Sequence, residues 1–148
     1  TRGVKILMSF WDSSALVPLC TNEHRSILAG RLWKSFPQKF VWWETSIEIY
    51  SALARIEREN NITTQQRLNA EKRLEILEKV WLEIQPTLRI KELARTFPAQ
   101  YKMKAADSLQ LAAALVWCKE KPKGKDFVSG DEHLIKIAQM VGFTTHLL

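Results

Sequence analysis

Four carboxylates of this chain stand at positions where an α/β protein gathers its chemistry. Asp12 ends an apolar segment typical of a strand, and Asp131 follows a later segment of the same kind. Because chemistry in open α/β sheets collects beyond the carboxyl ends of the strands, we expect these two acids to lie side by side. Glu48 and Asp107 fall near the starts of two predicted helices. The sequence therefore predicts a reaction centre built from carboxylates at one edge of a sheet.

Asp107 is the most informative of these acids. It lies in the segment Ala105–Cys118, which is apolar almost all round and so predicts a helix at the centre of the protein. An unpaired carboxylate in such surroundings costs considerable free energy. We therefore expect Asp107 to have a partner.

Each acid also has a purely structural interpretation as a helix cap. Asp12 could cap a short helix that begins at Ser13. Three further pairs fit the capping-box pattern, in which two side chains satisfy the first free amides of a helix. These pairs are Thr45 with Glu48, Ser129 with Glu132, and Asp107 with Gln110. Both interpretations stay open at this point.

Other kinds of site find little support. The three histidines, His24, His133 and His146, have no ligand-like spacing to one another or to the cysteines, which argues against a zinc site. The chain has no nucleophile elbow, Walker loop or dinucleotide-binding fingerprint. Ser13 and Ser14 lack a histidine partner for triad chemistry.

The elements that must position the acids alternate between strands and helices. Short apolar runs predict strands, and segments with helical spacing of apolar residues predict helices. The predicted strands are Val4–Trp11, Phe40–Trp43, Phe127–Ser129 and Phe143–Leu148. The predicted helices are 22–35, 45–59, 65–82, 87–96, Ala105–Cys118 and Asp131–Val141. This alternation predicts a layered α/β domain with a mostly parallel sheet.

Length and composition limit the remaining possibilities. A chain of 148 residues with 46% hydrophobic and 26% charged residues predicts a single globular domain over 1–148. No apolar stretch is long enough to span a membrane. Cys20 and Cys118 are far apart in sequence, which excludes a disulfide framework and favours a reducing cytoplasm. Residues 1–7 are interpreted as an extension or expression remnant, because Met8 would make a natural start.

The four acids occur within four motifs that together resemble a known family. The motifs read D-S-S-A-L-V from Asp12, T-S-I-E-I-Y-S-A-L-A-R around Glu48, A-A-D-S-L-Q-L-A-A-A-L around Asp107, and V-S-G-D before the last predicted helix. In this order and spacing they resemble the PIN domains, and more narrowly the VapC-type toxins of prokaryotic toxin–antitoxin pairs. The resemblance covers nearly the whole chain, from about Leu7 onward.

This resemblance implies a fold, an activity and a cofactor. The fold is a three-layer α/β/α domain with a mostly parallel central sheet, and the activity is that of a metal-dependent endoribonuclease. The catalytic and metal-holding residues carried over by motif are Asp12, Glu48, Asp107 and Asp131, which would hold Mg²⁺ or Mn²⁺. Such hard cations take oxygen ligands, as carboxylates are. Ser14 matches a small hydroxyl residue that orients the site.

The excess of positive charge, +6 at neutral pH, fits a polyanionic substrate such as RNA. An acid-rich centre repels RNA, so nearby cations must hold its backbone. The candidates by sequence proximity are Arg55, Arg58, Lys102 and Lys104. The two lysines stand where the family often has an arginine or similar residue before its third acid. The resemblance also implies a cognate antitoxin protein that docks over the active-site groove, and a homodimer.

Two other functions remain open from the sequence alone. The first is a PIN-type nuclease that serves RNA processing or turnover without an antitoxin. The second is a non-catalytic RNA-binding module that only retains the fold, because a fold does not by itself determine a function. The complete set of four acids argues against the second, since a module without chemistry has no reason to keep like charges together.

Overall fold

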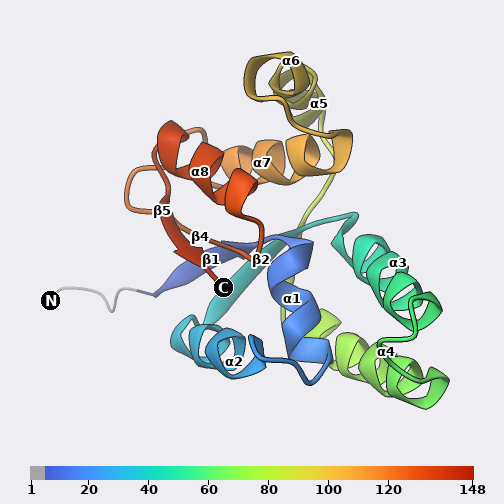
Figure 1. Ribbon diagram of the computed structural model, residues 1–148. Helices are drawn as coiled ribbons and strands as arrows, with labels where there is room; N and C mark the ends of the chain where they lie inside the picture. Colours follow the sequence, from blue (N-terminus) through green and yellow to red (C-terminus); the bar gives the residue numbers. More distant parts are fainter. Residues whose placement is uncertain (1–5) are drawn as a thin grey trace, which may run out of the picture.

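The computed structural model describes residues 6–148 and has a central sheet with helices on both faces (Figure 1). The strands are β1 (Met8–Trp11), β2 (Gln38–Trp42), β3 (Leu82–Ile84), β4 (Asp126–Ser129) and β5 (Thr144–Leu147). The helices are α1 (Ser13–Cys20), α2 (Ser26–Ser35), α3 (Thr45–Arg58), α4 (Thr64–Glu78), α5 (Leu88–Ala94), α6 (Phe97–Tyr101), α7 (Ala105–Trp117) and α8 (Glu132–Val141).

The sheet has the strand order β3-β2-β1-β4-β5, and every neighbouring pair is parallel. The predicted α/β class with a parallel sheet is therefore confirmed. From β1 the chain first proceeds through β2 and β3 on one side, and only later builds β4 and β5 on the other side. The carboxyl ends of β1 and β4 therefore form a topological switch point, where α/β sheets collect their ligands. Asp12 and Asp131 follow these two strands.

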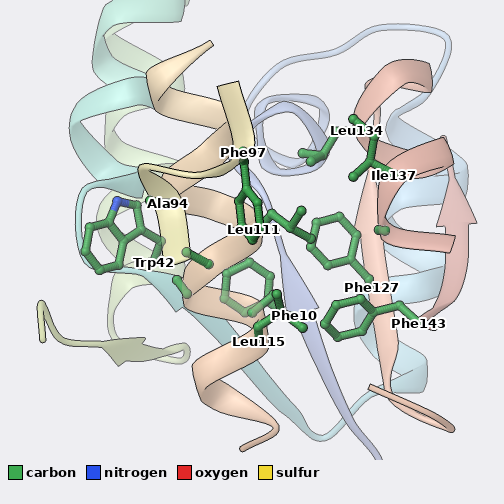
Figure 2. Close-up of a cluster of buried hydrophobic side chains, with 14 of the residues drawn as sticks. Phe10, Trp42, Ala94, Phe97, Leu111, Leu115, Phe127, Leu134, Ile137 and Phe143 are labelled. Atoms are coloured by element: carbon green, nitrogen blue, oxygen red, sulfur yellow. The ribbon is translucent and has the colours of Figure 1, made fainter. Parts of the chain in front are cut away.

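The sheet is buried on both faces because successive residues of its central strands point to opposite sides. Phe10 and Phe127 belong to one apolar cluster, whereas Trp11 and Val128 belong to the other. Helices α5 to α8 cover the first face, and α1 to α4 cover the second (Figure 1). In the first cluster the rings of Phe10 and Phe127 stack with centroids 5.6 Å apart, and Phe143 packs beyond them (Figure 2).

Two elements differ from the sequence-based expectations. The predicted helix 65–82 is too long, because α4 ends at Glu78 and residues 82–84 form the edge strand β3. Three residues are too few to show the alternation that predicts a strand. Helix α6 was not predicted, since Pro98 was interpreted as a stop, whereas it stands in the first turn, where proline is tolerated.

The ends of the chain and its cysteines complete the fold. Strand β1 begins at Met8, and residues 1–5 of the predicted extension lie outside the described part of the chain. Cys20 and Cys118 are buried free thiols. None of the helices within residues 6–148 has the length and apolarity that crossing a membrane requires.

Candidate functional site

Asp12 leads from β1 into α1 and is almost completely buried, with 2% of its surface exposed. Its backbone N–H donates to the Val128 carbonyl of β4 at 3.1 Å, which fixes it beside the switch point. Its carboxylate is the N-cap of α1 and accepts from the Ser14 backbone N–H at 3.4 Å. The predicted capping role of Asp12 is therefore confirmed. A cap does not require such burial, however, so capping alone does not account for this position.

Ser14 connects Asp12 to the loop after β4. Its hydroxyl donates to the Asp12 carboxylate, with oxygen distances of 2.9 and 3.0 Å, and accepts from the Gly130 N–H at 2.9 Å. The Ser129 hydroxyl lies 3.3 Å away and itself accepts from the Asp131 N–H at 3.0 Å. This chain of hydrogen bonds aligns the two strand ends, which is the geometry expected of a residue that orients the site.

Asp131 is the N-cap of α8, and its Oδ1 accepts from the Leu134 N–H at 2.9 Å. The predicted capping box of Ser129 with Glu132 is therefore wrong. Ser129 instead forms part of the connection to Ser14 described above. The cap holds the Asp131 side chain at the carboxyl end of β4.

Glu48 is held by hydrogen bonds from two other elements. Ser13 Oγ donates to Glu48 Oε2 at 2.6 Å, and Gln110 Nε2 of α7 lies 3.3 Å from Oε1. Helix α3 starts after Glu44 with no side-chain cap, so the predicted capping box of Thr45 with Glu48 is wrong. The contacts of Glu48 are long-range, and they bring α1, α3 and α7 together.

Asp107 stands in the first turn of α7, and no hydrogen bond to its carboxylate is found among residues 6–148. The N-cap of α7 is Lys104, which makes no side-chain cap, so the predicted capping box of Asp107 with Gln110 is wrong. Gln110 instead donates to Thr45 Oγ1 at 3.0 Å and to Glu48. The helix thus presents a carboxylate for which capping provides no explanation.

The four acids influence one another electrostatically. Burial raises the pKa of the Asp12 carboxyl from 3.8 to about 7, against the lowering effect of its serine partners, and the negative charge of Asp107 raises it further. Burial also raises the pKa of Glu48, with Asp107 among the contributing charges. For Asp107 itself, burial and the charge of Asp131 raise the pKa. Asp107 is therefore the electrostatic link among the four.

The residues present fit a hard divalent cation in their chemistry. None of the four carboxylates forms an ion pair within the described chain, so no direct salt bridge neutralises their negative charge. Over residues 6–148, no three His, Cys, Asp or Glu side chains lie close enough to hold a metal by themselves. Mg²⁺ commonly takes one or two carboxylates and keeps several waters, so two acids at a time satisfy its needs.

An open cleft of about 510 Å³ lies beside Glu48, between α1 and α3. Arg55 lines it, whereas Arg58, one turn farther along α3, is not among its lining residues. Lys104 lies near Asp107 and lowers its pKa, while Lys102 ends α6 in a left-handed conformation. Both lysines are exposed.

Several residues of the site were not identified from the sequence. Three side chains hold the acids directly, namely Ser13, Gln110 and Ser129. Thr45 accepts from Gln110, and Arg25 lines the cleft. The signal for Gln110 was available, because an amide on an otherwise apolar helix needs a partner. The sequence contains no comparable signal for Arg25, which approaches the site from the loop between α1 and α2.

Replacing Ser14 by Ala is expected to lower the free energy of unfolding by about 1–3 kcal/mol, because it leaves the Gly130 N–H without its acceptor. Denaturant unfolding in EDTA measures this loss. The matched control is Ser51→Ala, an exposed serine of the same cleft, for which we expect a change within about 0.5 kcal/mol. Equal stability of the two variants would contradict the role assigned to Ser14.

Comparison with known proteins agrees with this geometry. No protein-family model matches the chain. Ribonuclease VapC45 and ribonuclease VapC49, from two strains of Mycobacterium tuberculosis, are each 27% identical to it over 106 residues, which cover 72% of this chain and 74% of the relative. The resemblance to VapC proteins predicted from the motifs is thereby confirmed.

A solved structure shows the same fold. Mycobacterium tuberculosis VapC20, described as a sarcin-ricin loop cleaving toxin, aligns with a TM-score of 0.66 at 17% identity, over 93% of this chain and 96% of that chain. The five-stranded parallel sheet flanked by helices is therefore the fold of VapC proteins, as the sequence predicted.

Proposed function

We propose that this chain is a metal-dependent endoribonuclease and the toxin of a toxin–antitoxin pair. The proposal is carried by two observations: Asp12 and Asp131 follow the two strands at the switch point, and Asp107 is electrostatically coupled to Asp12, Glu48 and Asp131. Within residues 6–148 none of these four acids forms an ion pair. All three predicted capping boxes are absent, and only Asp12 and Asp131 cap helices, so capping does not explain Glu48 and Asp107. The names of the curated relatives, both ribonucleases, support the same reaction.

Two of the four acids at a time would hold Mg²⁺ or Mn²⁺, with waters as the remaining ligands. A bound cation of this kind supplies a Lewis acid that activates water and offsets the charge developing on a phosphate. The net reaction adds water across a phosphodiester bond, so that one oxygen–phosphorus bond forms and another breaks. The departing ribose oxygen takes up a proton.

The residues around the acids keep this arrangement in place before substrate arrives. Ser14 holds Asp12 in one orientation, and Ser13 and Gln110 do the same for Glu48. Fixed carboxylates need no reorganisation during the reaction, which is how polar active sites lower barriers. The open cleft beside Glu48 is the proposed site for a single strand of RNA.

The proposed contacts to the RNA backbone are Lys102, Lys104 and Arg55. Arg58 is a weaker candidate, because it does not line the cleft. Lys104→Ala is expected to lower the dependence of RNA affinity on salt by about one phosphate contact. Binding of an Asp107→Asn protein to RNA, measured over a range of salt, tests this. Lys123→Ala, in the loop before β4, should leave the slope unchanged. An unchanged slope in the Lys104 variant would remove that residue from the RNA path.

The proposed protein partner is a cognate antitoxin, encoded by a short reading frame beside the gene. One solved structure of the same fold is a toxin–antitoxin complex from Klebsiella pneumoniae, with a TM-score of 0.58 at 16% identity over 83% of this chain and 86% of that chain. We expect co-expression with the neighbouring product to suppress both toxicity and RNA cleavage. If no neighbour binds and induction leaves growth unaffected, a nuclease without an antitoxin becomes the better proposal.

A homodimer and a cytoplasmic location belong to the same proposal. The buried free thiols of Cys20 and Cys118 support a reducing compartment. The VapC-like fold is the basis for expecting a dimer, which light scattering of the purified protein tests directly.

The decisive experiment is incubation of the purified chain with total cellular RNA in Mg²⁺ or Mn²⁺, compared with EDTA. We expect discrete cleavage products with either metal and none with EDTA. Cleavage that persists in EDTA would contradict the metal dependence. Binding of RNA without cleavage under every condition would favour the non-catalytic module.

A further inference from the structure

We propose that Arg25 binds a phosphate of the RNA at the edge of the carboxylate centre, and that Gly130 leaves the space in which its guanidinium lies. The inference rests on the proposed function, since it names the residue that receives the substrate. It concerns a side chain outside the four motifs, from the loop between α1 and α2.

The space around Gly130 provides the first observation. A Cβ placed on Gly130 would lie 2.9 Å from Arg25 Nη1, and 3.2 and 3.4 Å from the carbonyl and hydroxyl oxygens of Ser14. Gly130 does not have the positive φ that favours glycine elsewhere in the chain, at Gly124 and Gly142. A side chain at this position would displace the guanidinium and crowd the Ser14 carbonyl. The space that Gly130 leaves thus holds the guanidinium beside the residue that precedes Asp131.

The second observation is that Arg25 is held from behind. Its Nε donates to Glu23 Oε1 at 2.8 Å, and the Glu23 N–H donates to Ser26 Oγ at 2.9 Å. Ser26 Oγ in turn donates to the Thr21 carbonyl at 2.9 Å. The loop is thus tied together at several points, and the arginine side chain is fixed with 32% of its surface exposed.

The third observation concerns the two terminal nitrogens of the guanidinium. Within residues 6–148, Nη1 and Nη2 of Arg25 have no protein acceptor, because its one ion pair uses Nε. Arg25 also lines the cleft that Ser14 and Glu48 share. A salt bridge to Glu23 alone would not require contact with Gly130. The two terminal nitrogens of the Arg25 guanidinium are therefore available to a ligand in the cleft.

Phosphate is the ligand that fits these two nitrogens. A guanidinium presents parallel N–H donors that match two phosphate oxygens, and it keeps its charge at any physiological pH. The four nearby carboxylates repel a polyanion, so a cation fixed beside them lets the backbone approach. Arg55 lines the same cleft but is exposed and pairs with Glu59 at 4.0 Å, so it is less firmly placed.

The test compares Arg25→Gln with Arg31→Gln, an exposed arginine of α2 that does not line the cleft. At limiting total cellular RNA with Mn²⁺, Arg25→Gln is expected to slow cleavage by about 10- to 100-fold, the worth of one hydrogen-bonded charge. In an Asp107→Asn background, it should lower the salt dependence of binding to a fluorescent oligouridylate by about one contact. Arg31→Gln should change neither quantity.

The two readouts separate this inference from the proposed function. If the wild type cleaves RNA and Arg25→Gln cleaves equally well, the inference is overturned while the nuclease stands. If the wild type does not cleave RNA, the nuclease proposal fails, and the oligouridylate slope alone decides on Arg25. An unchanged slope then overturns the inference.

Gly130→Ala tests the link between the two residues. We expect it to slow cleavage about as much as Arg25→Gln does, and to add little in the Arg25→Gln background, because both changes remove the same contact. Losses that add fully would show that the glycine makes room for Ser14 alone, which would overturn that part of the inference. Thermal unfolding of each variant confirms that the compared proteins are folded.

Discussion

Asp131→Asn and Asp107→Asn are each expected to reduce the rate of RNA cleavage by about 100-fold or more, while the protein stays folded. Several kcal/mol of transition-state stabilisation depend on the charge that binds a cation, and each 1.36 kcal/mol is worth about tenfold in rate. Asparagine caps a helix about as well as aspartate, so the bond from Leu134 N–H to residue 131 survives. Asp107 makes no hydrogen bond within the described chain that an amide would break.

The matched control for these variants is Asp126→Asn. Asp126 lies at the opposite end of β4 and pairs with His146 at 2.9 Å, away from the carboxyl end of the strand. The same chemical change there should leave the cleavage rate within about twofold, because Asp126 lies at the end of β4 opposite to the proposed centre. Cleavage at the wild-type rate by both the Asp107 and the Asp131 variants would contradict the assignment of the site. Capping would then be the better explanation of Asp131.

Asp12→Asn is expected to stabilise the metal-free protein at alkaline pH. The pKa of Asp12 is raised from 3.8 to about 7 by burial. Its protonated form is therefore favoured in the folded state, so stability is full below about pH 4 and is lost as the pH rises through about 7. At pH 8 the cost of the buried charge is up to about 4 kcal/mol, and the amide avoids it except for the loss from any unpaired N–H donor.

Denaturant unfolding of wild type and Asp12→Asn in EDTA, at pH 5 and pH 8, measures this difference. We expect the variant's advantage to grow from pH 5 to pH 8. Glu48 and Asp107 have raised pKa values too, so both proteins keep a residual slope of the same sign. Added Mn²⁺ should stabilise the wild type far more than the variant, because a ligand of the folded state stabilises it by mass action. A variant less stable than wild type at pH 8 in EDTA would contradict the buried charge.

The motifs around the acids predicted much of this protein because they are local. An apolar run followed by Asp12, and another followed by Asp131, sufficed to predict two strands whose ends meet, since parallel strands share one carboxyl edge. The helix around Asp107 was predicted for the same reason and is confirmed, because its apolar character on all sides is contained in thirteen consecutive residues. Edge strand β3 and helix α6 were not predicted, because segments of three and five residues are too short to show a period of apolar residues.

The hydrogen bonds of the acids could not be predicted in this way. The pattern of Thr45 with Glu48 is the same whether Glu48 turns back to cap its own helix or reaches Ser13, 35 residues away in sequence. Gln110 posed the same ambiguity, with Asp107 three residues before it and Thr45 65 residues away. Local patterns favour the near partner, and packing of α1, α3 and α7 selected the distant one.

The sequence by itself thus determined the fold class and the order of most elements, and it singled out the four acids of the proposed centre. Only the tertiary structure decided which of these acids are caps, that burial raises the pKa values of Asp12, Glu48 and Asp107, and that Arg25 lies against Gly130. The physical reason is the range of the interactions. The period of apolar residues and the ends of strands depend on neighbouring residues in the sequence. Desolvation of a carboxylate and the position of a guanidinium depend on segments that come together only when the chain has folded.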